Sequence, residues 1–324
     1  MFTASELLEK INTYVSDLTF RKKPEGLYEP IRYALSLGGK RIRPMLMLMA
    51  YNLYKDDVET ILSQAAGIEL YHNYSLLHDD LMDKSDFRRG KPTVHKKWNE
   101  STAILSGDAM LVIAYKLMAG SGKSLSGQVM RVFTETAMEI CEGQQMDMDF
   151  ESRMNVYEHE YLEMIRLKTS VLLACSLKVG ALLAGASEHD IQMLYDFGIN
   201  LGIAYQLKDD LLDVYGDPAV FGKPIGGDIL SNKKTYLLIQ ALRRARSTQA
   251  DELRKWIAAE QFDPQEKIKS VTALFDEIGV RDLCEDRISH YTLMAELNLQ
   301  MVQVPEEKKA VLKEMMQQLM HREV

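Results

Sequence analysis

The sequence predicts an all-α protein, a single domain built as a bundle of long helices. The chain of 324 residues has eight prolines, and none of them falls between Pro92 and Pro218. Because proline breaks helices, this stretch favours long helices. Apolar residues recur at steps of three and four in several segments, as in buried or half-buried helices, and no segment shows a convincing strand pattern.

Helices are expected wherever this apolar spacing is continuous. These segments are 61–83, 161–185, 196–215, 266–280 and 306–324. Loops are expected where glycine and proline cluster, because these residues interrupt regular structure. These loops are 21–26, 38–44, 84–93, 119–127 and 216–228.

Composition indicates a cytoplasmic protein. The net charge of −8 argues against a surface that binds nucleic acid or anionic membrane as a whole. Cys141, Cys175 and Cys284 have neither metal-type nor disulfide-type spacing, which favours free thiols in a reducing compartment. The N-terminus does not resemble a signal peptide, and no uninterrupted apolar stretch reaches the roughly 18–20 residues of a membrane span. We therefore expect no stable membrane insertion.

Two nearly identical acidic motifs, 79-DDLMD-83 and 209-DDLLD-213, lie far apart in the chain. On a helix, residues three or four apart share a face, and carboxylates gathered there repel one another unless cations lie among them. For a single motif, a solvated acidic patch is the better interpretation. Two copies, each at the end of an apolar helix and each followed by a basic loop that contains glycine, favour metal binding. Oxygen ligands of this kind suit Mg²⁺, which usually also binds substrate phosphates.

Basic residues that complement these acids occur in short groups. Taken alone, each is most simply a surface cation, but with two acidic motifs they indicate a site for two polyphosphate groups. They are Lys40, Arg41 and Arg43 after two glycines, Arg88 and Arg89 after the first acidic motif, and Lys168, Lys223 and Lys233 later in the chain.

Six motifs keep a characteristic order along the chain. They are GGKRIRP, HNYSLLHDDLMD, DFRRGKPTVH, LKTS, YQLKDDLLD, and GKPIGGD followed by NKKT. Together they resemble the trans-isoprenyl diphosphate synthases of the polyprenyl synthetase family, of the short-chain geranylgeranyl or farnesyl type. The resemblance covers about residues 30–240, and the helices of about 241–324 carry no further motif. It implies the isoprenoid synthase type I fold, one domain over 1–324 around a central cavity, and a cytoplasmic homodimer.

The resemblance also implies the reaction and the site. Such enzymes condense isopentenyl diphosphate head to tail with an allylic diphosphate and use three Mg²⁺ ions. The implied metal ligands are principally Asp79, Asp83 and Asp209, with Asp80, Asp210 and Asp213 beside them. The allylic diphosphate would be bound by Arg88, Lys168, Thr169, Gln206, Lys223 and Lys233, of which Arg88, Lys168 and Gln206 are the catalytic candidates. Isopentenyl diphosphate would be bound by Lys40, Arg43, His72 and Arg89.

Elementary chemistry agrees with these residue types. Ionisation of a C–O bond to diphosphate requires the developing negative charge to be neutralised by metal ions and fixed cations. The allylic carbocation then requires a dry, apolar cavity. His72 lies seven residues before Asp79, close to two helical turns, so that both share a face. A lone histidine on an apolar helix is otherwise more often a core residue. In the segment around 142-EGQQMDMD, Gln144 and Asp147 are weak candidates for supporting roles.

Product length depends on side chains one turn or more before Asp79, where Tyr74 and Ser75 are the candidate floor. Tyr74 is the fifth residue before Asp79. In the family, an aromatic residue at that position, together with a first acidic motif that has no insertion, resembles the C20 geranylgeranyl type more than the C15 farnesyl type. An ideal helical wheel puts Tyr74 away from the stripe of Asp79 and Asp83, so an ordinary core aromatic is the alternative. Two rival functions are a class I terpene cyclase and a non-catalytic regulatory subunit. The DDLLD second motif and the GGKRIRP site disfavour the cyclase, and the presence of both intact acidic motifs disfavours the regulatory subunit.

Overall fold

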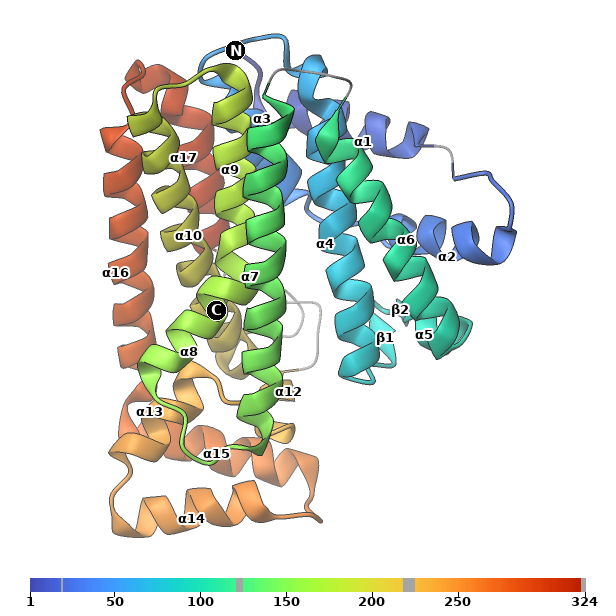
Figure 1. Cartoon of the computed structure of the whole chain (residues 1–324). Coiled ribbons are helices and arrows are strands. Elements are labelled where there is room, and N and C mark those ends of the chain that lie inside the picture. Colours follow the sequence, from blue (N-terminus) through green and yellow to red (C-terminus); the bar gives the residue numbers. More distant parts are fainter. Residues whose placement is uncertain (19, 121–124, 218–224, 322–324) are drawn as a thin grey trace. The chain divides into compact units, whose positions relative to one another are not determined.

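The computed structural model describes the chain apart from residues 19, 121–124, 218–224 and 322–324 (Figure 1). Within the described part, regular structure is helical except for one antiparallel ladder, in which β1 (Phe87–Arg88) pairs with β2 (Lys91–Pro92). The all-α prediction is confirmed.

The chain divides into two compact units. Unit 1 comprises Met1–Thr136, Cys175–Tyr195 and Val302–Leu312, and unit 2 comprises Ala137–Ala174, Asp196–Met301 and Lys313–Val324. A single domain around a central cavity stays a prediction.

The helices follow this division with four exceptions. Unit 1 holds α1 (Ala4–Asp17), α2 (Glu25–Ser36), α3 (Ile42–Asn52), the short η1 (Val58–Ile61), α4 (Leu62–Met82), α5 (Val94–Lys97) and α6 (Glu100–Ala119). Unit 2 holds α8 (Glu158–Ile165), the π-helical η2 (Arg166–Ser170), α12 (Gly227–Leu230), α13 (Tyr236–Arg244), α14 (Ser247–Ala258), α15 (Pro264–Ile278) and α16 (Val280–Met301). Residues of both units form α7 (Ser126–Ser152), α9 (Val171–Ala184), α10 (Glu188–Tyr215) and α17 (Glu306–Met320).

In unit 1, α4 and α6 pack against each other over an extensive contact (Figure 1). Glycines allow the close approach. A Cβ atom on Gly67 of α4 would lie 3.0 Å from Met118 Cγ, and one on Gly107 of α6 would lie 2.2 Å from His78 Nε2. The packing of α4 against α6 therefore depends on residues without side chains at both contacts.

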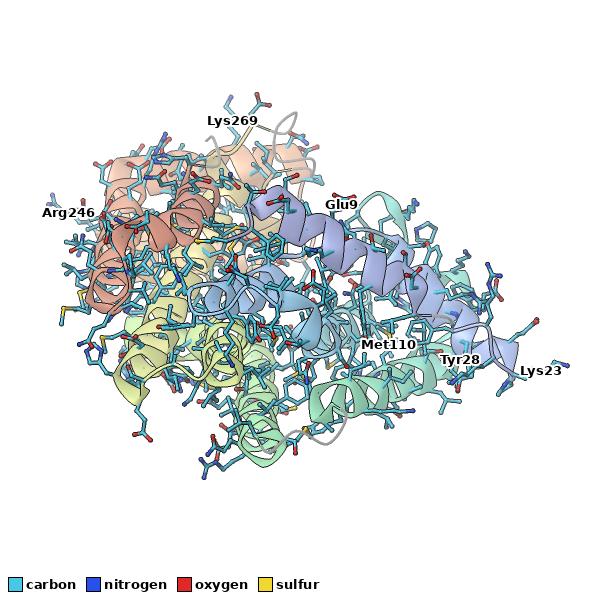
Figure 2. The ribbon with its side chains drawn as sticks, turned by 90° about the horizontal axis from the view of Figure 1, so that it is seen from above. Glu9, Lys23, Tyr28, Met110, Arg246 and Lys269 are labelled. Atoms are coloured by element: carbon cyan, nitrogen blue, oxygen red, sulfur yellow. The ribbon has the colours of Figure 1, made fainter. Side chains whose placement is uncertain are left out.

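Helix α6 has one buried and one exposed apolar face. Met110 is fully buried (Figure 2), whereas Ile104, Leu105 and Val112 are exposed. Among the described residues, two helices are apolar and long enough to span a membrane by composition alone, namely α6 and Glu158–Ala184. In Glu158–Ala184, 78% of the apolar window is buried, as in a core helix, but in α6 only 33% is buried. The absence of membrane insertion stays a prediction.

In unit 2, helix ends are set by local signals. Asp263 caps α15 by accepting a hydrogen bond from the Glu266 N–H, and Pro264 occupies the first helical position. Gly279 ends α15 with φ of 77°, a conformation that glycine adopts without strain. Buried side chains of α13, α14 and α15 then share one core, for example Leu237, Leu253 and Phe275.

The predicted helices are confirmed, with shifts at their ends. Segments 61–83, 266–280 and 306–324 correspond to α4, α15 and α17, and 196–215 is the C-terminal part of α10. Segment 161–185 is helical throughout except at its last residue, but its middle is the π-helical η2 rather than α-helix.

The predicted loops are partly wrong. Residues 42–44 already belong to α3, and 84–93 contains the β1–β2 ladder. Helices α2, α7 and α12 each begin inside a predicted loop, at Glu25, Ser126 and Gly227. The rest of 119–127 and 216–228 includes residues outside the described part.

Candidate active site

The first acidic motif lies at the C-terminal end of α4 in unit 1. Asp79 is half-buried, and Asp83 is the exposed C-cap residue, whose N–H donates to the Asp79 carbonyl at 2.9 Å. Asp80 is buried, and Arg88 Nε donates to its Oδ2 at 2.7 Å. Burial raises the pKa of Asp80, although Arg88 acts in the opposite direction. Among the described residues, Asp80 Oδ1 has no hydrogen-bond partner.

Arg88 and Arg89 are presented by a two-residue hairpin turn between β1 and β2. Arg89 and Gly90, the two turn residues, have φ of 53° and 73°, as a type I′ turn requires. The buried Thr93 hydroxyl anchors the base of the hairpin by donating to the Ser85 carbonyl at 2.7 Å. The turn directs Arg88 to Asp80, and Arg89 Nη1 donates to the carbonyl of Gly38. A short hairpin with an Arg-Gly turn was a signal that sequence reasoning missed.

The GGKRIRP segment forms the entry to α3. Gly38 and Gly39 have φ of 81° and 141°. A Cβ atom on Gly39 would lie 2.9 Å from Arg89 Nη2, so a side chain there would displace the guanidinium. Lys40 follows as an exposed residue. The absence of side chains at the two glycines thus allows the Arg89 guanidinium to lie directly against the backbone of this segment.

Arg41 was predicted to bind a polyphosphate group together with Lys40 and Arg43. This prediction is wrong, because its guanidinium is buried and already paired. Its side chain is 8% exposed and forms an ion pair with Glu69, which is 4% exposed, with 2.5 Å between Nη1 and Oε1. Asn73 Nδ2 donates to the same Glu69 oxygen at 2.9 Å. Arg41 therefore anchors the segment that carries Lys40 and Arg43 to α4. A buried glutamate in the apolar 61–83 segment was the available sequence signal.

Arg43 and His72 are brought together, as predicted. Arg43 Nη1 lies 3.1 Å from His72 Nε2. Burial, reinforced by the neighbouring arginines Arg43, Arg89, Arg88 and Arg41 in that order, holds the pKa of His72 well below its usual range. The imidazole is therefore neutral, and its Nε2 accepts the hydrogen bond from Arg43.

Tyr74 belongs to an aromatic cluster that comprises Tyr71, Tyr74, His78, Tyr115 and Phe133. The Tyr74 ring is 4.8 Å from the His78 ring and 5.4 Å from the Tyr71 ring, and Tyr71 contacts Phe133 at 5.2 Å. Ser75 donates to the His72 carbonyl of its own helix at 2.9 Å. Phe133 is fully buried, so the cluster packs against the core of unit 1.

The second acidic motif lies near the C-terminal end of α10, in unit 2. Asp209 and Asp213 are half-buried, and Asp210 is buried. Asp210 accepts hydrogen bonds from the Tyr161 hydroxyl and from Gln206 Nε2, the latter at 3.2 Å. Burial, with Asp228 as the next cause, raises the pKa of Asp210 to about 7. Both motifs therefore turn their second aspartate toward the interior of their own unit.

Lys168 and Thr169 lie in the π-helical η2. Lys168 Nζ donates to Asp147 Oδ2 at 2.7 Å, and Thr169 Oγ1 donates to Gln206 Oε1 at 3.1 Å. Asp147 thus contacts a predicted site residue, whereas a supporting role for the half-buried Gln144 stays a prediction. A π segment is often found at functional sites, and the uniform apolar period of this region hid it from the sequence.

Two glycines make room for η2. A Cβ atom on Gly143 of α7 would lie 2.4 Å from the backbone nitrogen of Lys168, and one on Gly202 of α10 would lie 2.5 Å from Ser170 Cα. Both contacts are with backbone or with atoms next to it, so a side chain at either glycine would shift the π segment.

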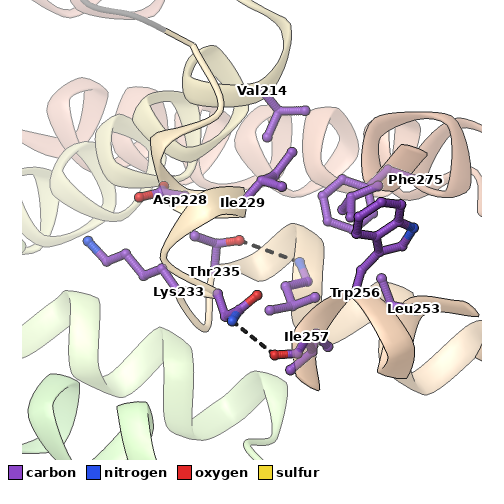
Figure 3. Close-up of a pocket in the computed structure, with 12 residues that line it drawn as sticks. Val214, Asp228, Ile229, Lys233, Thr235, Leu253, Trp256, Ile257 and Phe275 are labelled. Carbon is purple, nitrogen blue, oxygen red and sulfur yellow. Dashed lines mark hydrogen bonds between the residues drawn. The ribbon is translucent and has the colours of Figure 1, made fainter. Parts of the chain in front are cut away.

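Lys233 follows α12 in a turn that is linked to the second motif. The N–H of Asp228 donates to Asp213 Oδ2 at 2.9 Å, and the N–H of Lys233 donates to the Asp228 carbonyl at 2.9 Å. Figure 3 shows Asp228 and the exposed Lys233 on the same side of this turn. Lys223 lies outside the described residues.

The predicted site residues thus form two groups, one in each unit. The group of unit 1 is Lys40, Arg43, His72, Asp79, Asp80, Asp83, Arg88 and Arg89, and the group of unit 2 is Lys168, Thr169, Gln206, Asp209, Asp210, Asp213 and Lys233. Their union in one site stays a prediction. Sequence reasoning missed Glu69 and Tyr161. Glu69 had a signal in its apolar surroundings, and Tyr161 had none.

Comparison with known proteins bears on the identity of both groups. The family described as "Polyprenyl synthetase" matches residues 24–275. The chain is 41% identical over 236 residues to the geranylgeranyl diphosphate synthase of Methanosarcina mazei, which covers 72% of this chain and 73% of that protein. A crystal structure of a geranylgeranyl pyrophosphate synthase is 44% identical, with a TM-score of 0.92 and 100% of both chains covered.

A third similarity concerns a complex. The crystal structure of geranylgeranyl pyrophosphate synthase from Corynebacterium glutamicum, complexed with isoprenyl diphosphate and magnesium, is 30% identical, with a TM-score of 0.84 and coverage of 98% of this chain and 97% of that chain. The family match spans most of the chain and includes both acidic motifs and every basic group around them. This chain therefore belongs to the polyprenyl synthetase family, and it is a prenyltransferase.

Proposed function

We propose that the chain condenses isopentenyl diphosphate head to tail with an allylic diphosphate and forms a short-chain all-trans prenyl diphosphate, with the C20 geranylgeranyl product favoured over C15. One observation carries the proposal. Each acidic motif holds its second aspartate inside its unit and leaves the first and last carboxylates less buried, with fixed cations in the same unit. Family membership and the geranylgeranyl synthases among the relatives support the same reaction.

The acidic residues fit a hard divalent cation, because every proposed ligand is a carboxylate oxygen. Among the described residues, no three side chains of His, Cys, Asp or Glu form a ready cage for a metal. Mg²⁺ usually takes one or two carboxylates and completes its shell with water and substrate phosphates. The magnesium in the corynebacterial complex supports this choice.

We propose three Mg²⁺ ions, held principally by Asp79, Asp83 and Asp209. When bound, the ions would neutralise the charge that develops on the departing diphosphate. Asp80, Asp210 and Asp213 are the remaining proposed ligands. The hydrogen bonds of Asp80 and Asp210 to protein donors support a role in holding the motif backbone as well.

The fixed cations would bind and orient the two diphosphates. For the allylic diphosphate the proposed residues are Arg88, Lys168, Thr169, Gln206, Lys223 and Lys233. For isopentenyl diphosphate they are Lys40, Arg43, His72 and Arg89. The neutral His72 supports this assignment, because it leaves the arginine charge undiminished while it fixes the orientation of Arg43. Arg88, Lys168 and Gln206 are the proposed catalytic residues, since they would contact the leaving diphosphate.

Product length would be limited by the aromatic cluster. Tyr74 lies five residues before Asp79, its ring packs against Tyr71, and Tyr71 in turn packs against Phe133. Ser75 is small and hydrogen-bonded to its own helix, so it would add little bulk. A floor of this kind supports a product shorter than the long-chain polyprenyl diphosphates, and the relatives' names favour C20.

We also propose a cytoplasmic homodimer. The exposed apolar residues Ile104, Leu105 and Val112 on α6 support an interface between two copies, because a large exposed apolar face favours association. The proposed ligands are isopentenyl and allylic diphosphates. We expect the protein neither to bind nucleic acid nor to insert stably into a membrane.

A product assay tests the function. Purified protein is given isopentenyl diphosphate with dimethylallyl, geranyl or farnesyl diphosphate, first with Mg²⁺ and then with EDTA, and the dephosphorylated alcohols are separated by chain length. A Mg²⁺-dependent C20 alcohol is expected. A C15 product would mean that the cavity ends closer to the metal ions than proposed. If folded protein elongates no primer, the proposal is refuted.

A further inference from the structure

The most unusual charge outside the two site groups is Lys267 of α15. Its side chain is 1% exposed, although lysine is almost never fully buried unless it is paired. Among the described residues it forms no ion pair. Its ammonium donates to Asn232 Oδ1 at 2.8 Å and to the Leu230 carbonyl at 3.4 Å, and it lies 4.2 Å from the centroid of the Phe262 ring. Burial lowers the pKa of Lys267.

Such a buried cation is costly. An apolar residue of similar size would avoid the desolvation of an ammonium, and replacing buried charges by apolar residues is often neutral or stabilising. Stability alone therefore does not account for lysine at this position. Both of its hydrogen bonds go to the short segment that directly precedes Lys233, which directs attention to that segment.

Asn232 is the residue that Lys267 holds. It has φ of 54°, which few residues other than glycine adopt readily and which asparagine tolerates. Its Nδ2 donates to the Ile257 carbonyl at the end of α14, at 3.1 Å, while Lys267 donates to its Oδ1. The Asn232 carbonyl in turn accepts a hydrogen bond from Lys234 Nζ at 3.2 Å. The side chain of Asn232 is thus clamped between α14 and α15.

The clamp sets the course of the next residues. Because Asn232 is in the left-handed conformation, the chain reverses at the end of α12 and brings the Lys233 N–H to the Asp228 carbonyl at 2.9 Å. The Asp228 N–H donates to Asp213 Oδ2 at 2.9 Å. Lys267 is therefore hydrogen-bonded to Asn232, the chain continues directly to Lys233, and hydrogen bonds lead from Lys233 through Asp228 to the last aspartate of the second motif.

We propose that Lys267 is a positioning residue, which holds Asn232 so that Lys233 is presented to the allylic diphosphate. The inference rests on the proposed function, in which Lys233 binds that diphosphate. It also assigns a role to the helices after about residue 241, in which no motif was recognised: α14 and α15 supply both partners of Asn232. Lys267 itself does not contact the substrate.

The test compares Lys267→Met with a matched control, Lys269→Met. Lys269 lies on the same helix and is exposed (Figure 2). We expect Lys267→Met to raise the KM for the allylic diphosphate about tenfold and to leave the KM for isopentenyl diphosphate within about twofold, and Lys269→Met to change neither. Such selectivity for one substrate is a readout that a general loss of folding would not produce. Equal effects on both KM values would overturn the inference.

A second variant covers the case in which Lys267→Met does not fold. Asn232→Gly removes the clamped side chain while keeping a residue that tolerates φ of 54°. It should raise the same KM, and the double variant should be no worse than the more affected single variant, because both changes cut one connection. Additive effects would show that Lys267 acts by another route.

Lys233→Ala separates this inference from the proposed function. If wild-type protein elongates and Lys233→Ala raises the allylic KM while Lys267→Met does not, the positioning role is refuted and the function stands. If Lys233→Ala leaves the allylic KM unchanged, the assignment of Lys233 fails and the role of Lys267 fails with it. Inhibition by inorganic diphosphate with Mg²⁺ gives an independent measure of the same site, and it should weaken in parallel in Lys233→Ala and Lys267→Met.

Discussion

The ion pair between Arg41 and Glu69 allows a quantitative prediction. Its two side chains are 8% and 4% exposed and are separated by 2.5 Å. Glu69→Gln removes one charge and leaves the Arg41 guanidinium buried without a counter-charge. Removing one partner of a buried pair typically costs about 3–5 kcal/mol, because the other charge has already lost its hydration. We expect Glu69→Gln to lower the free energy of unfolding by about 3 kcal/mol, since Asn73 and the new amide retain part of the hydrogen bonding.

The measurement is urea denaturation of wild type and variants, followed by circular dichroism. The pair of Lys10 and Glu59 is a matched control, because it has the same 2.5 Å separation in the same unit while its side chains are 29% and 55% exposed. Exposed pairs contribute about 0–1 kcal/mol, so Glu59→Gln should have a small effect. Equal losses in Glu69→Gln and Glu59→Gln would refute the reasoning from burial.

The same variant carries a functional expectation. Arg41 anchors the segment of Lys40 and Arg43, so Glu69→Gln should also raise the KM for isopentenyl diphosphate about tenfold, a difference of about 1.4 kcal/mol. The KM for the allylic diphosphate should change little. A variant that is destabilised but binds isopentenyl diphosphate normally would show that the anchor serves stability alone.

Three further predictions concern single residues. Phe133→Leu removes a buried ring from the aromatic cluster and should shift part of the product beyond C20, as read by chromatography of the alcohols; an unchanged product length would exclude the cluster as the floor. The lowered pKa of His72 means that the unfolded imidazole takes up a proton below about pH 6.5 while the folded one does not, so stability should fall as pH drops through this value, and His72→Gln should lack that part of the slope in denaturation series. Gly143→Ala would place a Cβ 2.4 Å from the Lys168 nitrogen and should cost about 1–3 kcal/mol and at least tenfold in kcat, whereas Gly127→Ala on the same helix, with nothing within 4 Å, should leave both unchanged; a harmless Gly143→Ala would refute the close packing of η2.

Several features of the site could not be predicted because they depend on contacts between residues far apart in sequence. Arg41 and Arg43 look equivalent in GGKRIRP. In the structure, Arg41 forms a buried ion pair with Glu69 of α4, whereas Arg43 donates a hydrogen bond to His72. The same holds for the aspartates: only the positions of Arg88 and Tyr161 show that Asp80 and Asp210 point inward.

The sequence by itself determined the helical class and the main helices, and it supplied the proposed residues of the site. Apolar spacing, prolines and helix caps act within a few residues, and the six motifs kept their chemistry in recognisable order. Only the tertiary structure decided what each polar side chain does. Burial sets the pKa of His72 and Asp210, Gly143 and Gly202 accommodate the π segment, and a lysine from a motif-free helix holds Asn232. Burial and hydrogen bonding arise from segments that meet only after folding, so no local pattern reports them.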